Sequence, residues 1–509
     1  MNLDHFKNLF KRLGEANLSK ILHSRLIVLF VGLIVLNISL FITQSSYGLS
    51  SLDTSHTTVK AKAQKSSSAD TQLAKKVDKV AHEVLKSTGV PSASVAVVQH
   101  GQIVYVQAYG AAKLDPHVKA NPTMRYAIGS ISKQFTAATI LLLEQEGKIS
   151  LDDHVSKWLP SLTKANEVTI RELLSHTSGY QDFWPQDYVP PMMRKSIKPQ
   201  EILNRWAKRP LDFEPGTRWQ YSNTNFVIAG QIVEKITHEP FFKYLHEHIL
   251  NPLDMKSAVN FDKGKLTKNG PTGYTRYALG PLRPAPQEGS GWMAGAGELA
   301  MTPRDLAKWD ISIIDQSLLS SKSYKQLETE VRLKSGVGTG YGLGVEVGMM
   351  NGHRMISHSG EVSGFTAENV VFPDDSAAVV VLTNQDAASA AGAIARGVSH
   401  LFFKTQDAQT EMRTKQAREI FIGLQHGKIN RSLFTSDANY YFSKQALQDF
   451  QSSLGPLGAP KTFVQTSENE RGGMLERSFR VEVKNRVLRV WTYQKPNGKL
   501  EQYQVAPQH

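Results

Sequence analysis

The 509-residue chain contains no cysteine. That absence excludes disulfide bonds, thiol nucleophiles and thiolate metal sites. The sequence also lacks a dense basic stripe, although its formal net charge is +13. Residues 1–76 hold ten Lys or Arg residues against four Asp or Glu residues, and the remaining excess is spread thinly. Because nucleic-acid interfaces cluster their positive charge, we expect no nucleic-acid partner.

The composition is otherwise that of a globular protein, with 40% hydrophobic and 21% charged residues. Such a balance excludes disorder as the main state of the chain. A chain of this length exceeds one compact core, so we expect two or three domains.

The first 72 residues predict export. A basic lead over residues 1–25 precedes an 18-residue apolar run at 26–43, which is typical of a signal peptide or a short membrane anchor. The basic lead is expected to stay in the cytoplasm, so the rest would be periplasmic or extracytoplasmic, secreted or anchored to the inner membrane. Residues 44–72 are rich in Ser, Thr, Lys and Ala and predict a flexible linker.

Residues 73–404 predict an α/β domain. An amphipathic helix over 71–87 precedes a hairpin turning at His100-Gly101, and β-rich runs return at 353–360 and 365–384 around a second turn. The residues between are mostly helical in pattern. We therefore expect one antiparallel sheet flanked by helices, with an inserted helical lobe.

A small α+β domain is expected over residues 405–509. Two helical stretches precede strands in a meander, which has a turn at Asn497-Gly498. Its order of elements loosely resembles the nuclear-transport-factor-like fold. The sequence assigns it no ligand.

Ser130 and Lys133 form a Ser-x-x-Lys motif at the start of an apolar helix that ends near Gly147. Three residues span about one helical turn, so both side chains share a face. A serine hydroxyl needs a base, and a lysine amine can serve when desolvation leaves it neutral. The motif alone is weak, because Ser161 and Lys164 repeat it without a following apolar helix.

Two further motifs accompany Ser130 in chain order. Tyr221-Ser222-Asn223 is the one Tyr-x-Asn of the sequence, and His358-Ser359-Gly360 is its one His-x-Gly. The three motifs together resemble the serine β-lactamase and penicillin-binding protein superfamily. The resemblance is closest to the class C-like branch, which includes D-alanyl-D-alanine carboxypeptidases, D-aminopeptidases and esterases, and it extends over about 75–403.

The resemblance implies a role for each motif residue. Ser130 would be the nucleophile, with Lys133 and the Tyr221 phenol sharing its proton. Asn223, His358, Ser359 and Gly360 would bind substrate, and the backbone N–H groups of Ser130 and Glu361 would form the oxyanion hole. No metal or other cofactor is implied.

One departure bears on the substrate. Many β-lactamases of this branch carry Lys where this chain has His358, and histidine is largely neutral near pH 7. We therefore expect a serine hydrolase that acts on D-amino-acid peptides, as a carboxypeptidase does, or on carboxylic esters. The substrate would be a small molecule or a peptide, with the cell wall as one source. There are three alternatives. The first is a membrane-anchored penicillin-binding sensor or cell-wall-binding protein that acylates without turnover. The others are a genuine β-lactamase and an inactive scaffold that displays the C-terminal domain.

Other conspicuous residues have structural interpretations. His176 is expected to be structural, and His246 and His248 should point apart on a helix, which disfavours a metal site. Gly295, Gly297 and Gly344 are expected to let backbone segments approach closely.

Overall fold

The structure is a computed structural model that describes residues 68–264, 266, 270–403, 408–484 and 486–507. The predicted basic lead and apolar run lie outside these residues. Within the described ranges, no helix is long and apolar enough to cross a membrane. The helix predicted over 71–87 is α3 (Ser68–Thr88), so it begins inside the segment that the sequence assigned to the linker.

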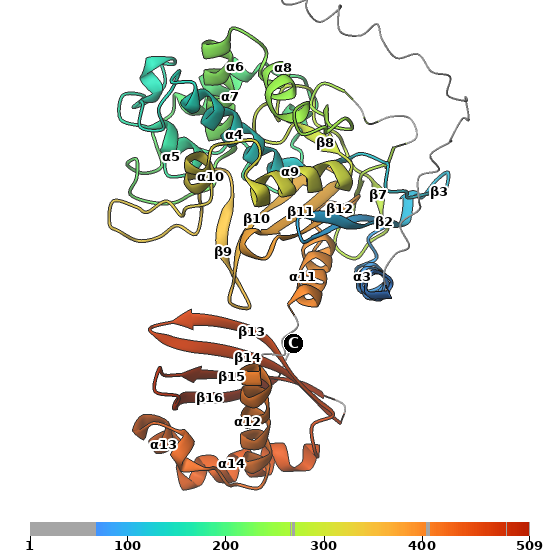
Figure 1. Cartoon of the computed structure of the whole chain (residues 1–509), viewed down its shortest axis with the longest axis vertical. Coiled ribbons are helices and arrows are strands. Elements are labelled where there is room, and N and C mark those ends of the chain that lie inside the picture. The colour runs from blue at the N-terminus through green and yellow to red at the C-terminus, as the bar shows by residue number, and fades with distance from the viewer. Residues whose placement is uncertain (1–67, 265, 267–269, 404–407, 485, 508–509) are drawn as a thin grey trace, which may run out of the picture. The chain divides into compact units, whose positions relative to one another are not determined.

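A seven-stranded antiparallel sheet forms the centre of the first domain (Figure 1). Its strand order is β3-β2-β1-β12-β11-β10-β9, so the N-terminal hairpin pairs with strands from the end of the domain. The strands are β1 (Ser92–Gln99), β2 (Gln102–Lys113), β3 (Val118–Lys119), β9 (Glu346–Met350), β10 (His353–Val362), β11 (Phe365–Phe372) and β12 (Ala377–Thr383). The predicted α/β class and the closure of the sheet by both ends of the domain are confirmed.

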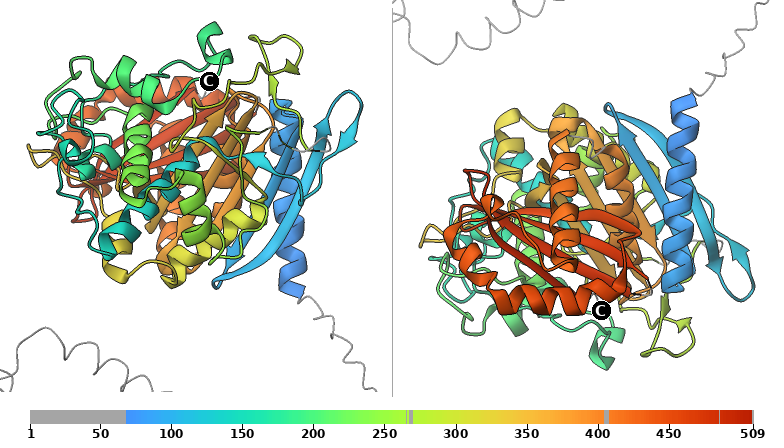
Figure 2. Two further views of the ribbon diagram at one scale, coloured as in Figure 1. Left: turned by 90° about the horizontal axis from the view of Figure 1, so that it is seen from above. Right: turned by 90° about the horizontal axis from the view of Figure 1, so that it is seen from below.

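Alternating side chains bury both faces of this sheet. In β1, Val95 and Val97 pack into one hydrophobic cluster, whereas Ala96 and Val98 pack into the other. This period of two follows from strand geometry. Helices α3 and α11 (Ala390–Phe402) cover the first face, and α4 (Ser132–Gln145) and α9 (Pro303–Asp315) lie on the opposite side (Figure 1). Figure 2 shows the layers from two further directions, with α3 against β1 and β2.

The inserted lobe between β4 and β9 is mainly helical, as predicted. Its helices are α5 (Ile170–Leu174), α6 (Pro199–Ile202), α7 (Asn223–Thr237), α8 (Phe241–Leu245) and α10 (Ser321–Leu327). Small sheets join its segments through β4 (Tyr126–Ala127), β5 (Val259–Asn260), β6 (Tyr274–Thr275), β7 (Arg283–Pro284) and β8 (Leu299–Met301).

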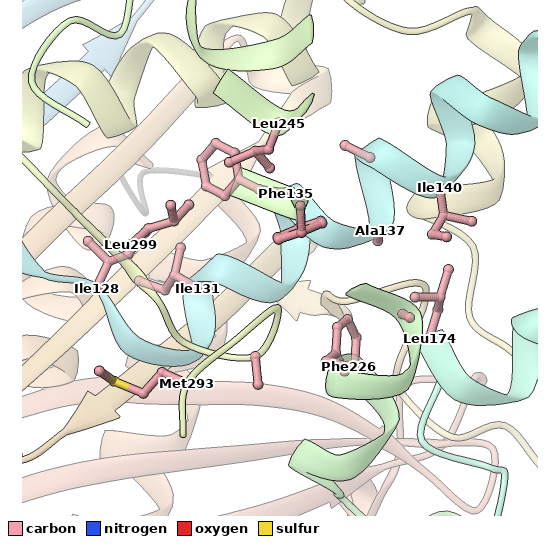
Figure 3. Close-up of a cluster of buried hydrophobic side chains, with 14 of the residues drawn as sticks. Ile128, Ile131, Phe135, Ala137, Ile140, Leu174, Phe226, Leu245, Met293 and Leu299 are labelled. Atoms are coloured by element: carbon pink, nitrogen blue, oxygen red, sulfur yellow. The ribbon is translucent and has the colours of Figure 1, made fainter. Parts of the chain in front are cut away.

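Helix α4 is the centre of the larger hydrophobic cluster. Eleven of its fourteen residues are buried, including Phe135 and Ile140. Leu174, Phe226 and Leu299 come from other parts of the chain and pack around it (Figure 3). A helix that is apolar on nearly all sides is held from every direction, which fixes the residues at its N-terminal end.

The C-terminal domain has its own core. Three helices, α12 (Ala408–Gln425), α13 (Ser436–Tyr441) and α14 (Lys444–Leu454), precede a four-stranded antiparallel meander. The strands are β13 (Thr462–Arg471), β14 (Met474–Val483), β15 (Arg486–Gln494) and β16 (Leu500–Pro507). The helices-then-strands order agrees with the prediction, but β13 was not predicted, because its sequence TFVQTSENER is mostly polar.

Candidate active site

Ser130 lies in a single 3-10 turn, η1 (Gly129–Ile131), directly before α4. The predicted helix therefore begins two residues after the serine. Gly129 has a φ of 52°, and a Cβ there would lie 2.6 Å from the Glu361 nitrogen. Only glycine permits this turn to pass so close to β10, so Gly129 fixes where Ser130 sits.

Lys133 lies beneath Ser130 and is completely buried. Its Nζ atom is 2.9 Å from Ser130 Oγ, 2.8 Å from Asn223 Oδ1 and 2.8 Å from the Ala296 carbonyl oxygen. Burial lowers the pKa of Lys133 to about 7, although the charge of Asp182 opposes the shift. A neutral amine can donate its two N–H groups to the two carbonyl oxygens, which leaves its lone pair for the Ser130 hydroxyl.

Tyr221 completes the group around the serine. Its hydroxyl lies near enough to Ser130 for the two groups to interact, and the Lys133 Nζ atom is 4.9 Å from the centre of its ring. Burial raises the pKa of Tyr221 far above its ordinary value, so the phenol keeps its proton near pH 7. The structure therefore brings the hydroxyl, amine and phenol of the three motif residues together.

Asn223 begins α7 and is held between two charged groups. Its Oδ1 accepts a hydrogen bond from Lys133, while its Nδ2 lies 3.2 and 3.3 Å from the two carboxylate oxygens of Asp182. Asp182 also accepts the backbone N–H of Asn223 at 3.0 Å. Asp182 was not predicted from the sequence, because it lies in an irregular segment with no spacing that relates it to Asn223.

His358 lies in β10 with both ring nitrogens occupied. Nδ1 is hydrogen-bonded to the Ser359 carbonyl oxygen, so this nitrogen carries the proton and Nε2 accepts from the Tyr341 hydroxyl at 2.8 Å. Burial, with the charge of Lys133, lowers the pKa of His358 to about 3. The ring is therefore neutral and has no free nitrogen for a substrate. His358 nevertheless lines the cleft, and the substrate-binding role that the sequence predicted for it stays a prediction.

The backbone around Ser130 and Glu361 is closely packed. A Cβ on Gly360 would lie 1.9 Å from the Ile128 carbonyl oxygen and 3.3 Å from the Ser130 nitrogen. This close approach of β10 to η1 brings the Ser130 and Glu361 nitrogens near one another. Such proximity is what an oxyanion hole requires, and the assignment of that role stays a prediction.

A cleft of about 790 Å³ opens over these residues. Ser130, Tyr221, Asn223, Ser359 and Glu361 all line it. The segment 182–189, Trp219 and Trp292 form further parts of its wall. Its size is that of an ordinary small-molecule site.

His176 supports the site from behind. Its side chain is fully buried, its Nδ1 accepts the Ser222 backbone N–H at 3.1 Å, and its ring lies 4.2 Å from that of Tyr221. The residue therefore holds the turn that carries Tyr221, in agreement with the structural interpretation.

Two of the three glycines that were predicted to permit close backbone approach do so. A Cβ on Gly344 would lie 2.6 Å from the Lys133 carbonyl oxygen, and one on Gly295 would lie 2.5 Å from that of Phe226, so both permit close approach. Gly297 has only ordinary contacts. His246 and His248 pack on different rings, and no group of three metal-ligating side chains occurs among the described residues.

Comparisons with known proteins agree with this geometry. The sequence model of the beta-lactamase family matches residues 77–401. Protein flp of Staphylococcus aureus strain MW2 is 29% identical over 318 residues, which cover 60% of this chain and 62% of that protein. This chain thus spans less than two thirds of that relative's length.

Two solved structures share the fold. A D-stereospecific amidohydrolase from Streptomyces sp. is 26% identical with a TM-score of 0.56, and the match covers 65% of this chain and 98% of the other. The octameric penicillin-binding protein homologue from Pyrococcus abyssi is 22% identical with a TM-score of 0.58, and the match covers 85% of this chain and 99% of the other. With the family match over more than half of its length, the chain belongs to the beta-lactamase family, in the superfamily of serine β-lactamases and penicillin-binding proteins.

Proposed function

We propose that the protein is a serine hydrolase that forms an acyl-enzyme on Ser130 and acts on D-amino-acid peptides or amides, or on carboxylic esters. The observation that carries the proposal is the buried Lys133 amine, which lies 2.9 Å from the Ser130 hydroxyl and is held by two carbonyl acceptors. A positioned, partly neutral amine is the base that a serine nucleophile needs.

Acylation forms a bond between Ser130 Oγ and the carbonyl carbon and breaks the bond to the leaving group. Ser130 Oγ attacks the carbonyl carbon while its proton passes to Lys133, and the backbone N–H groups of Ser130 and Glu361 stabilise the negative oxygen. The C–N or C–O bond then breaks, and the leaving group takes a proton from the Tyr221 hydroxyl, which Lys133 restores. Water next attacks the acyl carbon, and the Oγ–C bond breaks as Ser130 regains its proton.

The choice of substrate rests on two supporting observations. The neutral His358 ring offers no permanent charge to a substrate carboxylate, which disfavours an anionic β-lactam. A relative of known structure, 26% identical, is a D-stereospecific amidohydrolase. Both favour a D-amino-acid amide, peptide or ester over an antibiotic.

We also propose that the protein is exported through its N-terminal segment. The support is the basic lead over 1–25 and the apolar run over 26–43. In intact spheroplasts, external protease should remove a C-terminal tag if the proposal holds, and should spare the tag if the chain stays inside.

The sequence supplies a matched control for Ser130. Ser161 also has a lysine three residues later, yet it is exposed and lies outside the cleft. We expect Ser130→Ala to abolish hydrolysis of p-nitrophenyl butyrate and Ser161→Ala to preserve it, with both variants showing the circular dichroism spectrum of the parent. Retained turnover in a folded Ser130→Ala protein would overturn the proposal.

A further inference from the structure

The wall of the cleft carries a marked excess of negative charge. Five acidic side chains line it, namely Asp182, Asp187, Glu346, Glu361 and Asp386. Among the described residues, Arg194 is the one basic side chain that lines the cleft. Clefts lined by one sign of charge raise the local concentration of ligands of the opposite sign.

Three of these lining carboxylates are coupled electrostatically, and we call them the acidic corner: Asp187, Glu361 and Asp386. The charges of Asp386 and Asp187 both raise the pKa of Glu361, in addition to the larger effect of its burial. None of the ion pairs found among the described residues includes a member of this group. Within the described part of the chain, the acidic corner therefore has no ion-pair partner.

Asp386 in particular has an unused oxygen. Its side chain is 8% exposed, and its Oδ2 accepts the Gly364 backbone N–H at 2.9 Å. Its Oδ1 is buried and has no hydrogen-bond partner among the described residues. Burial raises the pKa of this carboxyl, although the Gly364 N–H and Thr275 oppose the shift. An unpaired carboxylate oxygen in such a place is unfavourable until a donor reaches it.

The position of the acidic corner relates it to the reaction. Glu361 carries the backbone N–H that is proposed to hold the carbonyl oxygen, and the residue lines the same cleft as Ser130. Its side chain is already oriented by the Ala387 backbone N–H, which donates to Oε1 at 2.9 Å. A positive group on a substrate bound at Ser130 can therefore face these carboxylates.

Aromatic side chains at the same cleft suit an organic cation. Tyr188, Trp219 and Tyr277 line it and are 66%, 40% and 70% exposed. Aromatic faces attract ammonium groups and also bury attached hydrocarbon. The described residues include no cluster of three metal-ligating side chains, which favours an organic ammonium over a metal ion.

We propose that the acidic corner binds the ammonium group of the substrate, so that the enzyme prefers amides or esters carrying a positively charged amine over neutral or carboxylate-bearing ones. This inference rests on the proposed serine hydrolase activity and narrows its substrate class. Within that class, it favours substrates with a free amino group over those recognised by a terminal carboxylate.

Two isosteric esters test the proposal. The p-nitrophenyl ester of 6-aminohexanoate carries a positively charged ammonium group that can donate hydrogen bonds, and that of heptanoate has a methyl group in its place. We expect kcat/KM to be higher for the cationic ester by on the order of tenfold at low salt. The ratio should fall as salt is added, because screening weakens attraction between charges.

Variants locate the effect. Asp386→Asn and, independently, Asp187→Asn should each reduce the ratio of the two kcat/KM values toward one; Asp187 is exposed, so its variant does not depend on tolerance of a buried change. Asp449→Asn removes an exposed carboxylate of the C-terminal domain and should leave the ratio unchanged. Equal hydrolysis of both esters by the parent, or a ratio that survives both cleft variants, overturns this inference alone. If neither ester is hydrolysed and neither acylates Ser130, the proposed function itself fails.

Discussion

At the scale of single residues, Lys133 decides what the site can do. A lysine with its ordinary pKa is almost fully charged at pH 7 and cannot accept a proton. Here burial lowers the pKa to about 7, so a large fraction of the amine is neutral at that pH. The two carbonyl oxygens that hold Nζ also fix the direction in which the lone pair points.

The pH dependence of kcat/KM should therefore follow the Lys133 amine. Because the neutral form is the base, kcat/KM for p-nitrophenyl butyrate should rise with pH through an apparent pKa of about 7. Well below that pH it should fall about tenfold per unit, as the amine becomes protonated. Rates measured from pH 5 to 9 check this, and a profile that is flat across pH 7 would contradict it.

The charge of Asp182 should affect the pH at which kcat/KM rises. Its negative charge favours the ammonium form and so raises the pKa of Lys133. Removing the charge in Asp182→Asn should lower the Lys133 pKa and move the rising limb of kcat/KM to lower pH. A merely structural loss would reduce the rate without moving the limb.

Asp187→Asn is the matched control for this shift. Asp187 lines the same cleft but is not among the groups that shift the pKa of Lys133. The rising limb of the kcat/KM profile of Asp187→Asn should lie at the same pH as in the parent enzyme. A limb that moves to higher pH in Asp182→Asn would show that the assumed coupling has the wrong sign.

Not all of the site could be predicted from single residues. Ser130, Lys133 and Tyr221 were found because their motifs have fixed spacing and occur in a known order. Asp182 and the Ala296 carbonyl oxygen were missed, since an irregular segment and a backbone acceptor leave no pattern in the sequence. The hydrogen bond between His358 and Tyr341 was also missed, because no spacing in the sequence relates the two residues.

At the scale of elements, short motifs position the catalytic helix and its neighbours. Helix α5 begins with a capping box, in which Thr169 Oγ1 accepts the Glu172 N–H at 3.2 Å and Glu172 Oε2 accepts the Thr169 N–H at 2.8 Å. This box immediately precedes the turn that carries His176. The capping box therefore helps to position His176, which holds Ser222 and Tyr221.

Loss of this cap should destabilise the first domain measurably. Thr169→Ala removes the side-chain acceptor, which costs about 1 kcal/mol at a helix N-terminus. Urea unfolding of the full chain, followed by loss of ester hydrolysis, measures the change. Thr169→Ser keeps the acceptor oxygen and should remain near the parent, so an equal loss in both variants would exclude the cap as the cause.

Elements were predicted best where their pattern is strong. The β1–β2 and β11–β12 hairpins and helix α4 have long apolar runs, and all were located. The 3-10 turn before α4 was not, because its backbone is set by the close approach of β10 rather than by local sequence. Strand β13 is an edge strand with few apolar residues, so no alternation distinguished it.

At the scale of the whole molecule, the described residues form two domains with separate cores. The two large clusters of the first domain use residues up to Phe403, and that of the second begins at Ala417. All residues that line the catalytic cleft belong to the first domain. The antiparallel sheet was predictable from its strands, whereas the function of the second domain is not encoded in any motif.

A chain ending at residue 403 should therefore keep its activity. Because its core and cleft are complete without the C-terminal domain, we expect kcat/KM for p-nitrophenyl butyrate within about twofold of the full chain. Steady-state kinetics and a thermal unfolding scan of the shortened protein check this. An insoluble or inactive product would show that the second domain is needed by the first.

In each turnover, Ser130 should become acylated and then lose the acyl group to water. Rapid-quench mixing with p-nitrophenyl butyrate, followed by intact-protein and peptide mass analysis, tests it most directly. We predict a butyryl adduct on the peptide that contains Ser130, forming within the first turnover and disappearing when the ester is exhausted. An adduct on another residue, an adduct that persists, or turnover without any adduct would show that Ser130 does not form a transient acyl-enzyme.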